Sequence, residues 1–398
     1  MRPFFLLLCA CFAVVTLVNA QSNYEKGKII DSIAVSQAQN ETFSLYLPES
    51  FMSETPQPIL YIYEPMGRGT IGVQPFIAAS EKYGLILVCS NNSKNGPYDQ
   101  NFAIANNLFN HVFSNFNIKD DEMFAAGFSG GSRLASAIAS LTNKFSGVIG
   151  CGAGFSGLQE HMPSTQNYAY VGLCGNRDMN YREMLENKAY LNLINFNSAL
   201  ITYDDNHSWP PSGQILRAFD WLYLQRTKNS PPVQIDAVLS FYKTDYNLLQ
   251  QFLDNKKWLF AAEQYERIIK DYKDHIQVDS LETKYHLFKN SKHYKKSVAA
   301  LNRALNIEEK FSSKFRSRFS QEFENSNTFN YNWWEKELGK LEVLAEKEGD
   351  EIKKMAARVK YDLFARAFVR KNGIMQSSNT AQVASLNQLL QLVYPNFK

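Results

Sequence analysis

The stretch Gly127-Phe128-Ser129-Gly130-Gly131 decides how the first half of this chain folds. It fits the pattern G-x-S-x-G, between a strand-like run, Met123–Ala126, and a helix-like run, Ser132–Ser140. A strand-to-helix turn of this kind strains the backbone of the serine, and small neighbours prevent clashes. The pattern predicts that the Ser129 hydroxyl stands above a sheet as a nucleophile. The alternative is a plain loop or a phosphate cradle, but the lysine of a P-loop is missing.

Outward from this turn, short strand signals alternate with helical patterns. The strand signals are Lys28–Val35, Glu41–Leu47, Ile59–Tyr63, Leu85–Cys89, Met123–Phe128, Gly147–Cys151, Tyr168–Cys174 and Ala199–Tyr203. The helical patterns are Gln74–Tyr83, Ala103–Phe116, Gly131–Ser140, Arg182–Asn195 and Gly213–Leu224. This alternation predicts an α/β fold, with a mostly parallel sheet covered by helices on both faces. The first two strands have no helix between them, so we expect an antiparallel hairpin at the sheet edge.

A serine hydroxyl is a weak nucleophile and needs a base, for which His207 is the candidate. In folds with this turn, the acid and then the histidine follow the serine along the chain. His207 lies in the loop after the last strand signal, whereas His111 precedes the serine and His161 precedes the acid candidate. The order therefore favours His207 as the general base.

Asp178 is the candidate acid because it follows the strand Tyr168–Cys174 directly. A buried carboxylate there would fix the tautomer of the imidazole and stabilise the imidazolium. Asp204 and Asp205 share the loop of His207, and Glu183 falls within the next helix, which makes them weaker rivals. The structural alternative for Asp178 is to cap that helix.

Acyl transfer also requires two N–H donors for the oxyanion. One donor is expected from the backbone of Gly130, the residue after the nucleophile, and the other from the loop after the third strand. Pro65 has no N–H, so Met66 or Gly67 remains, and we favour Met66.

With these features together, the stretch 28–224 resembles the α/β-hydrolase superfamily, and within it small secreted esterases of the polyhydroxybutyrate depolymerase-like and the feruloyl or acetylxylan esterase-like groups. The resemblance rests on Gly127–Gly131, Gly175-Asn-Arg-Asp178 and His207-Ser-Trp-Pro210. It implies a catalytic triad of Ser129, Asp178 and His207. In one departure, Glu64-Pro65 stands where the family usually has His-Gly.

The second half of the chain has a different character. A polar linker, 226–233, carries two prolines and is expected to stop the preceding helix. Residues 234–398 show apolar positions at helical spacing, with a loose offset of about 36 residues that is near the tetratricopeptide period. We expect an all-α domain of helix pairs, with tetratricopeptide-like repeats as one form that it could take. Its surface is mildly basic, which is typical of a solvated helix surface with mixed charge.

The N-terminus, 1–20, predicts a secretory signal peptide, with Arg2 followed by an apolar run that ends at Ala20. An uncleaved membrane anchor is the alternative. The mature chain, beginning at 21, would be secreted or periplasmic and would keep Cys89, Cys151 and Cys174. Buried free thiols are expected, with a Cys151–Cys174 disulfide as the alternative.

The sequence therefore predicts a two-domain serine esterase, with a hydrolase domain at 21–225 and a helical domain that covers the site, binds a protein partner or mediates assembly. No metal or cofactor is implied, and a net charge of +3 is too small to indicate nucleic acid. Phe155, Tyr181 and Trp209 suggest an aromatic or carbohydrate-linked ester. The rival functions are a prolyl-oligopeptidase-type peptidase and a non-enzymatic binding protein with a relic hydrolase domain.

Overall fold

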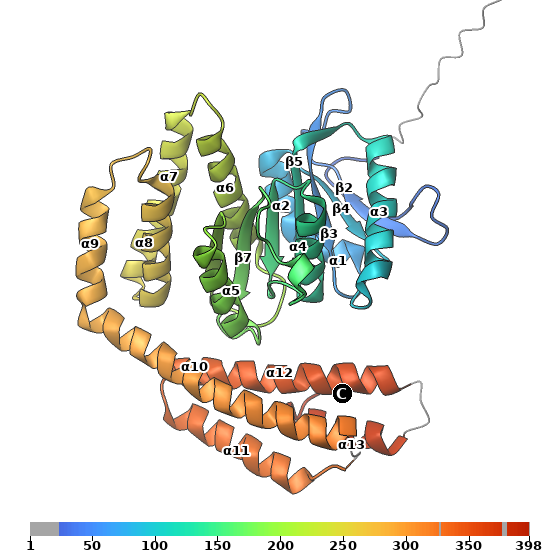
Figure 1. Cartoon of the computed structure of the whole chain (residues 1–398), viewed down its shortest axis with the longest axis vertical. Helices are drawn as coiled ribbons and strands as arrows, with labels where there is room; N and C mark the ends of the chain where they lie inside the picture. The colour runs from blue at the N-terminus through green and yellow to red at the C-terminus, as the bar shows by residue number, and fades with distance from the viewer. Residues whose placement is uncertain (1–23, 326–327, 376–379, 398) are drawn as a thin grey trace, which may run out of the picture.

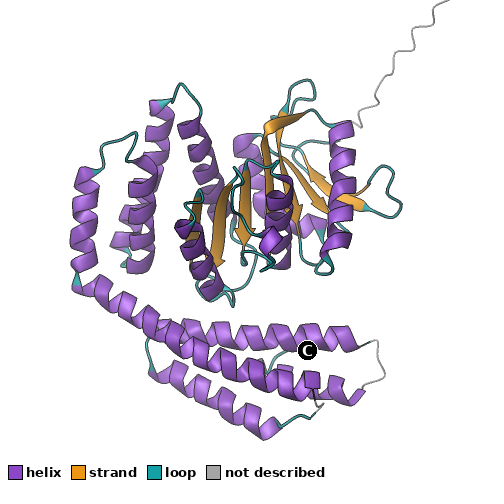
Figure 2. Ribbon diagram, viewed as in Figure 1, coloured by secondary structure: helices purple, strands orange, loops and turns teal. Residues whose placement is uncertain are grey.

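The computed structural model describes residues 24–325, 328–375 and 380–397 of the chain. The leader predicted at 1–20 lies outside these residues. Helices and strands alternate in the first half of the molecule, and the second half is helical (Figures 1 and 2).

An eight-stranded sheet forms the centre of the first half, in the order β1-β2-β4-β3-β5-β6-β7-β8. Its strands are β1 (Ile29–Ala34), β2 (Thr42–Tyr46), β3 (Gln57–Tyr63), β4 (Ile86–Ser90), β5 (Ile118–Phe128), β6 (Gly147–Cys151), β7 (Ala169–Gly175) and β8 (Ser198–Tyr203). The pairs from β4 to β8 are parallel, whereas β2 is antiparallel to both of its neighbours. The mostly parallel α/β sheet and the antiparallel hairpin at its edge are confirmed, and the strand order is that of the α/β-hydrolase fold.

Helices cover both faces of this sheet (Figure 1). They are α1 (Gly69–Val73), α2 (Ile77–Tyr83), α3 (Tyr98–Asn115), α4 (Gly130–Thr142), α5 (Tyr181–Leu193) and α6 (Ser212–Asn229), with short 3-10 turns at Gln74–Phe76 and Gln159–His161. One core lies between the sheet and α3 and α4, and the other between the sheet and α1, α2 and α6. Adjacent residues of β3, such as Leu60 and Tyr61, point into different cores because side chains alternate along a strand.

The second half contains only helices among its described residues. They are α7 (Ile235–Asp254), α8 (Trp258–Tyr272), α9 (Asp279–Asn290), α10 (Lys292–Phe319), α11 (Tyr331–Lys347), α12 (Asp350–Ile374) and α13 (Thr380–Val393), with a π-helical turn at Ser320–Asn325. The linker predicted at 226–233 is shorter than expected, because α6 continues through Arg226 to Asn229 and the break is confined to the residues around Pro231 and Pro232.

Two separate cores hold these helices together. Helices α7 to α9 share one core with Leu224 of α6, and α10 to α13 share another, centred on Trp334 and Leu363. A 34-residue helix–turn–helix repeat has no room for α10, which alone has 28 residues. The last four helices therefore form a bundle of long helices that differs from the helix pairs suggested by the sequence offset.

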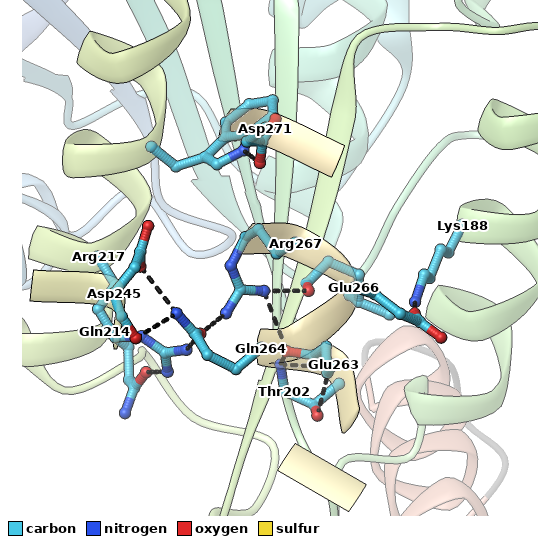
Figure 3. Close-up of polar contacts among 12 residues, drawn as sticks. Lys188, Thr202, Gln214, Arg217, Asp245, Glu263, Gln264, Glu266, Arg267 and Asp271 are labelled. Atoms are coloured by element: carbon cyan, nitrogen blue, oxygen red, sulfur yellow. Dashed lines mark hydrogen bonds and ion pairs between the residues drawn. The ribbon is translucent and has the colours of Figure 1, made fainter. Parts of the chain in front are cut away.

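Helix α8 covers the open edge of the sheet at β8 (Figure 3). The Glu263 carboxylate accepts the backbone N–H of Thr202 at 3.1 Å and its hydroxyl at 2.8 Å. Further along the same helix, Arg267 donates to the carbonyl of Leu200 at 3.3 Å. The Lys270 amine in turn donates to the carbonyl of Ser198 at 3.1 Å. Ser198, Leu200 and Thr202 are alternate residues of β8 whose backbone groups point away from β7. Each of them bonds to a side chain of α8, so β8 is not a free sheet edge.

The three cysteines described, Cys89, Cys151 and Cys174, are buried and free. Cys151 and Cys174 lie on neighbouring strands, but Cys151 is opposite Leu173 in the register. No helix in the described ranges combines the length and apolar character needed to cross a membrane.

The turn at Ser129 requires a glycine at position 131. A Cβ atom at Gly131 would lie 2.0 Å from the carbonyl oxygen of Tyr63, a backbone atom of β3 that cannot move aside easily. We predict that Gly131→Ala lowers the free energy of unfolding by about 1–3 kcal/mol, as overpacking usually does. Urea unfolding measures the change.

Gly213→Ala is the matched control, since nothing lies within 4 Å of the added Cβ in the first turn of α6. Alanine favours a helix over glycine, so this change should leave stability equal or raise it by up to about 1 kcal/mol. Equal stability of the two variants would contradict the packing argument.

Candidate active site

Ser129 connects β5 to α4 and has the strained backbone that its sequence context predicts. Its backbone angles, φ of 54° and ψ of −119°, fall in a region that residues other than glycine rarely adopt. The turn is fixed from both sides, because the Ser129 N–H donates to the carbonyl of Cys151 at 2.8 Å and its carbonyl accepts the N–H of Ser132 at 3.1 Å. Such strain persists only where surrounding contacts over-determine it, as at a functional site.

His207 lies in the loop between β8 and α6, within reach of this serine. Its Nε2 is 3.0 Å from the Ser129 Oγ, and its Nδ1 is 2.8 Å from Oδ2 of Asp178. Because an ionised carboxylate only accepts hydrogen bonds, Nδ1 is the donor to Asp178 and Nε2 is left to accept the serine proton. The three residues singled out from the sequence thus meet in one hydrogen-bonded chain.

Asp178 is buried, with 1% of its side chain exposed. Burial raises the pKa of its carboxyl, and the hydrogen bond from His207 opposes that rise. The second oxygen, Oδ1, accepts the N–H of Asn180 at 2.8 Å, and the Asn180 side chain in turn donates to the carbonyl of Gly152 at 2.7 Å. Sequence reasoning missed Asn180, although its position two residues after an aspartate is typical of an Asx turn.

The acid loop and the base loop, 176–180 and 204–211, are bonded to each other. The Asn176 side chain donates to Asp204 at 2.6 Å, and the N–H of Arg177 donates to the carbonyl of Asp205 at 2.9 Å. The Arg177 guanidinium also donates to the Asn206 side chain at 2.8 Å. These bonds explain how two segments far apart in sequence keep a common geometry.

The rival residues are engaged elsewhere. His111 accepts the N–H of Ser36 at 2.9 Å, and burial lowers its pKa. His161 is bonded to Ser156 at 2.8 Å and packs against Tyr98. Glu183 pairs with Arg133 at 2.7 Å. None of these contacts involves Ser129.

The oxyanion loop differs from the expectation for Met66. The Met66 N–H donates to Oε2 of Glu64 at 2.7 Å, and the N–H of Gly67 donates to the Glu64 carbonyl at 3.1 Å. Glu64 is 1% exposed and also accepts from Arg68, so this carboxylate organises the whole turn. The amide proposed as the second donor is therefore already bonded to the Glu64 carboxylate.

Asn95 is a further site residue that the sequence did not reveal. A Cβ atom at Gly130 would lie 1.8 Å from Oδ1 and 3.3 Å from Nδ2 of Asn95, so the side-chain amide rests against the residue after the nucleophile. The N–H of Asn95 donates to the carbonyl of Pro65 at 2.8 Å. A cavity of about 200 Å³ is lined by Glu64, Asn95 and Gly130. Nothing in a polar Asn-rich loop distinguished this asparagine in advance.

The aromatic residues expected to contact a substrate lie elsewhere. Phe155 and Tyr181 are buried, and each belongs to a hydrophobic core. Trp209 packs on Phe76 and Phe128 at ring-centroid distances of 5.7 and 5.3 Å. Burial in the core removes Phe155 and Tyr181 from the substrate, so the argument for an aromatic or carbohydrate-linked ester no longer rests on them.

Comparison with known proteins gives structural likenesses only. No family model matches the sequence, and no curated protein does. An S-formylglutathione hydrolase from Staphylococcus aureus is 20% identical, with 49% of this chain and 95% of that chain covered and a TM-score of 0.42. A feruloyl esterase module from Clostridium thermocellum is 14% identical, with 49% and 86% covered and a TM-score of 0.40.

An esterase from Thermogutta terrifontis is 11% identical, with 51% of this chain and 94% of that chain covered and a TM-score of 0.38. These matches extend over about half of the present chain. The assignment of the fold rests instead on the strand order and on the strained turn at Ser129. By these features, the first half of the chain has the α/β-hydrolase fold.

The raised pKa of Asp178 has a consequence for stability. A carboxyl whose pKa is higher in the folded state stabilises the fold below its unfolded pKa, and this contribution is lost as the pH rises through the folded pKa. Asp178→Asn removes the charge while keeping the shape. We predict a higher free energy of unfolding than wild type at pH 7, and a difference that shrinks toward about pH 4, as urea unfolding at both values would show.

Asp204→Asn is the control of opposite sign. Burial alone would raise the pKa of Asp204, but the bonds from Lys257 and Asn176 outweigh it and lower the pKa. Its contribution is present above the unfolded pKa and is lost as the pH falls, so this variant should be less stable than wild type at pH 7. A loss of stability in Asp178→Asn at pH 7 would mean that the His207 bond outweighs burial.

Proposed function

We propose that this chain is a serine hydrolase that cleaves carboxylic esters through an acyl-enzyme intermediate. The observation that carries the proposal is the hydrogen-bonded chain Ser129–His207–Asp178, with distances of 3.0 and 2.8 Å, at a strained strand-to-helix turn. A nucleophile bonded to a base that is oriented by a buried carboxylate is the arrangement of acyl-transfer enzymes. The N-terminal leader predicted from the sequence supports secretion.

In the proposed reaction, His207 Nε2 takes the Ser129 proton as the Oγ attacks the ester carbonyl. Asp178 accepts the Nδ1 hydrogen bond throughout, and it stabilises the imidazolium without taking the proton. The imidazolium then protonates the leaving alcohol. A water molecule, activated by the same imidazole, hydrolyses the acyl group from Ser129 and releases the acid.

The oxyanion needs two N–H donors, but the Met66 amide that we expected to supply one of them is bonded to Glu64. The N–H of Gly130 remains the first proposed donor. For the second, we propose the Nδ2 group of Asn95, since this side chain rests against Gly130, with Nδ2 3.3 Å from the position that a Cβ atom at Gly130 would take. Met66 would serve only if a substrate displaced its bond to Glu64.

The rival functions have less support. A relic hydrolase domain would leave the serine and the histidine apart, whereas their reactive atoms are 3.0 Å apart. No feature of the described residues favours a peptide bond over an ester.

We predict that Ser129→Ala lowers hydrolysis of p-nitrophenyl acetate and butyrate by several orders of magnitude, because no nucleophile remains to form the acyl-enzyme. Covalent labelling by a fluorophosphonate should be lost as well. Ser208→Ala, an exposed serine next to the base, is the matched control and should keep both activities. Equal turnover by wild type and Ser129→Ala would refute the proposal.

Asn95→Ala tests the oxyanion donor. Loss of one such donor lowers kcat by about 10²–10³-fold with little change in KM, because the bond forms only in the transition state. Asn92→Ala, a change in the same loop, should leave kcat within a few-fold of wild type. If the two variants have similar kcat values, Asn95 is not the donor and Met66 becomes the better candidate.

A further inference from the structure

Helix α12, of the C-terminal bundle, reaches the catalytic histidine. The ring of Tyr361 lies 5.4 Å from the imidazole of His207, centroid to centroid, at an angle of 49°. Phe128, from β5, contacts the same imidazole at 4.6 Å. The base is thus held by aromatic rings from both halves of the chain, and only 6% of its side chain is exposed.

One turn earlier on the same face of α12, Arg358 is anchored on the acid loop. Its side chain is completely buried. Nη1 donates to the carbonyl of Asn176 at 2.7 Å, two residues before Asp178, and Nε donates to Glu308 of α10 at 2.8 Å. The guanidinium also lies 5.0 Å from the ring of Tyr181, which begins the helix after the acid loop.

A buried guanidinium without partners would be strongly unfavourable, and here each of the three guanidinium nitrogens donates a hydrogen bond. The Glu308 carboxylate balances the charge within the bundle, and the carbonyl of Asn176 accepts a bond from Nη1 across the boundary between the two halves. The arrangement fixes α12 against the loop that carries Asp178. It also sets the distance at which Tyr361 meets His207.

We propose that α12 is part of the active site, with Tyr361 and Arg358 as positioning residues for the base and the acid. This inference rests on the proposed function. Tyr361 restricts the imidazole to the orientation that points Nε2 at Ser129, and its ring stabilises the imidazolium formed during the reaction. Arg358 holds the acid loop at the distance that keeps the Asp178–His207 bond.

The ring of Tyr361, rather than its hydroxyl, carries this role. Among the described residues, the hydroxyl has no hydrogen-bond partner, and burial raises its pKa, so it is uncharged at neutral pH. Phenylalanine should therefore substitute for Tyr361, whereas leucine should not, because it has similar apolar character without an aromatic face.

The first experiment compares Tyr361→Phe and Tyr361→Leu in the full-length protein. We expect Tyr361→Leu to lower kcat and the rate of fluorophosphonate labelling at Ser129 roughly tenfold, with KM little changed, and Tyr361→Phe to stay within about twofold of wild type. Tyr331→Leu, at an exposed tyrosine on α11, is the control for a general effect on the bundle. Wild-type rates in Tyr361→Leu would overturn the proposal.

The second experiment separates positioning by Arg358 from simple stabilisation. Arg358→Met alone leaves Glu308 buried without a partner and should lower the melting temperature. The double variant Arg358→Met with Glu308→Leu removes both charges together and should recover the melting temperature, since apolar side chains replace a buried ion pair well. It still lacks the bond to Asn176, so we expect labelling to remain about tenfold slower. Recovery of both properties would show that Arg358 only stabilises the bundle.

Labelling keeps this test distinct from that of the ester proposal. If wild type is labelled at Ser129 but hydrolyses no ester, the ester proposal fails while the labelling rates of the variants still decide the role of α12. If wild type is labelled and every variant is labelled equally fast, only the inference about α12 fails. If wild type is not labelled at all, both are wrong.

Discussion

The edge of the sheet at β8 is the constraint on which the rest of the molecule depends. A strand at an edge has unpaired backbone groups, and here α8 supplies partners for them through Glu263, Arg267 and Lys270. Three or four residues of a helix rise about 4.5–6 Å, and two residues of a strand rise about 6.6 Å, so long side chains one helical turn apart can reach alternate strand residues. The helical region is therefore docked on the strand that leads directly into the base loop.

Because α8 is docked on β8, other parts of the helical region also contact the loops that hold Asp178 and His207. Lys257, just before α8, pairs with Asp204 of the base loop at 2.6 Å, and Asp204 is bonded to Asn176 of the acid loop. In the same acid loop, the Asn176 carbonyl accepts a bond from Arg358 of α12. Acid and base are thus supported from two helices that belong to different cores. Burial of Asp178 is unfavourable for its charge, and these surrounding contacts allow the fold to retain it.

In the loop after β3, one buried carboxylate determines where the backbone amides are directed. Glu64 introduces a buried carboxylate where the resembling esterases have a histidine, and a carboxylate seeks several donors. It takes the amide of Met66 and the side chain of Arg68. The sequence places this loop after the third strand, but the direction of the Met66 amide depends on which nearby acceptor is strongest. That competition is decided by three-dimensional contacts, as is the approach of Asn95 to Gly130.

The sequence by itself determined the alternation of strands and helices, the turn at Ser129 and the order of Ser129, Asp178 and His207, because each depends on local periodicity or on small residues at fixed spacing. The tertiary structure alone decided the length of α6 past Arg226, the bundle of α10 to α13 and the contacts of Arg358 and Tyr361. Asn176 of the acid loop and Arg358 of α12 are 182 positions apart, and helical periodicity shows which face of α12 is apolar but not what it covers. Long-range packing determines that α12 covers the acid loop, because the buried Arg358 needs hydrogen-bond partners there.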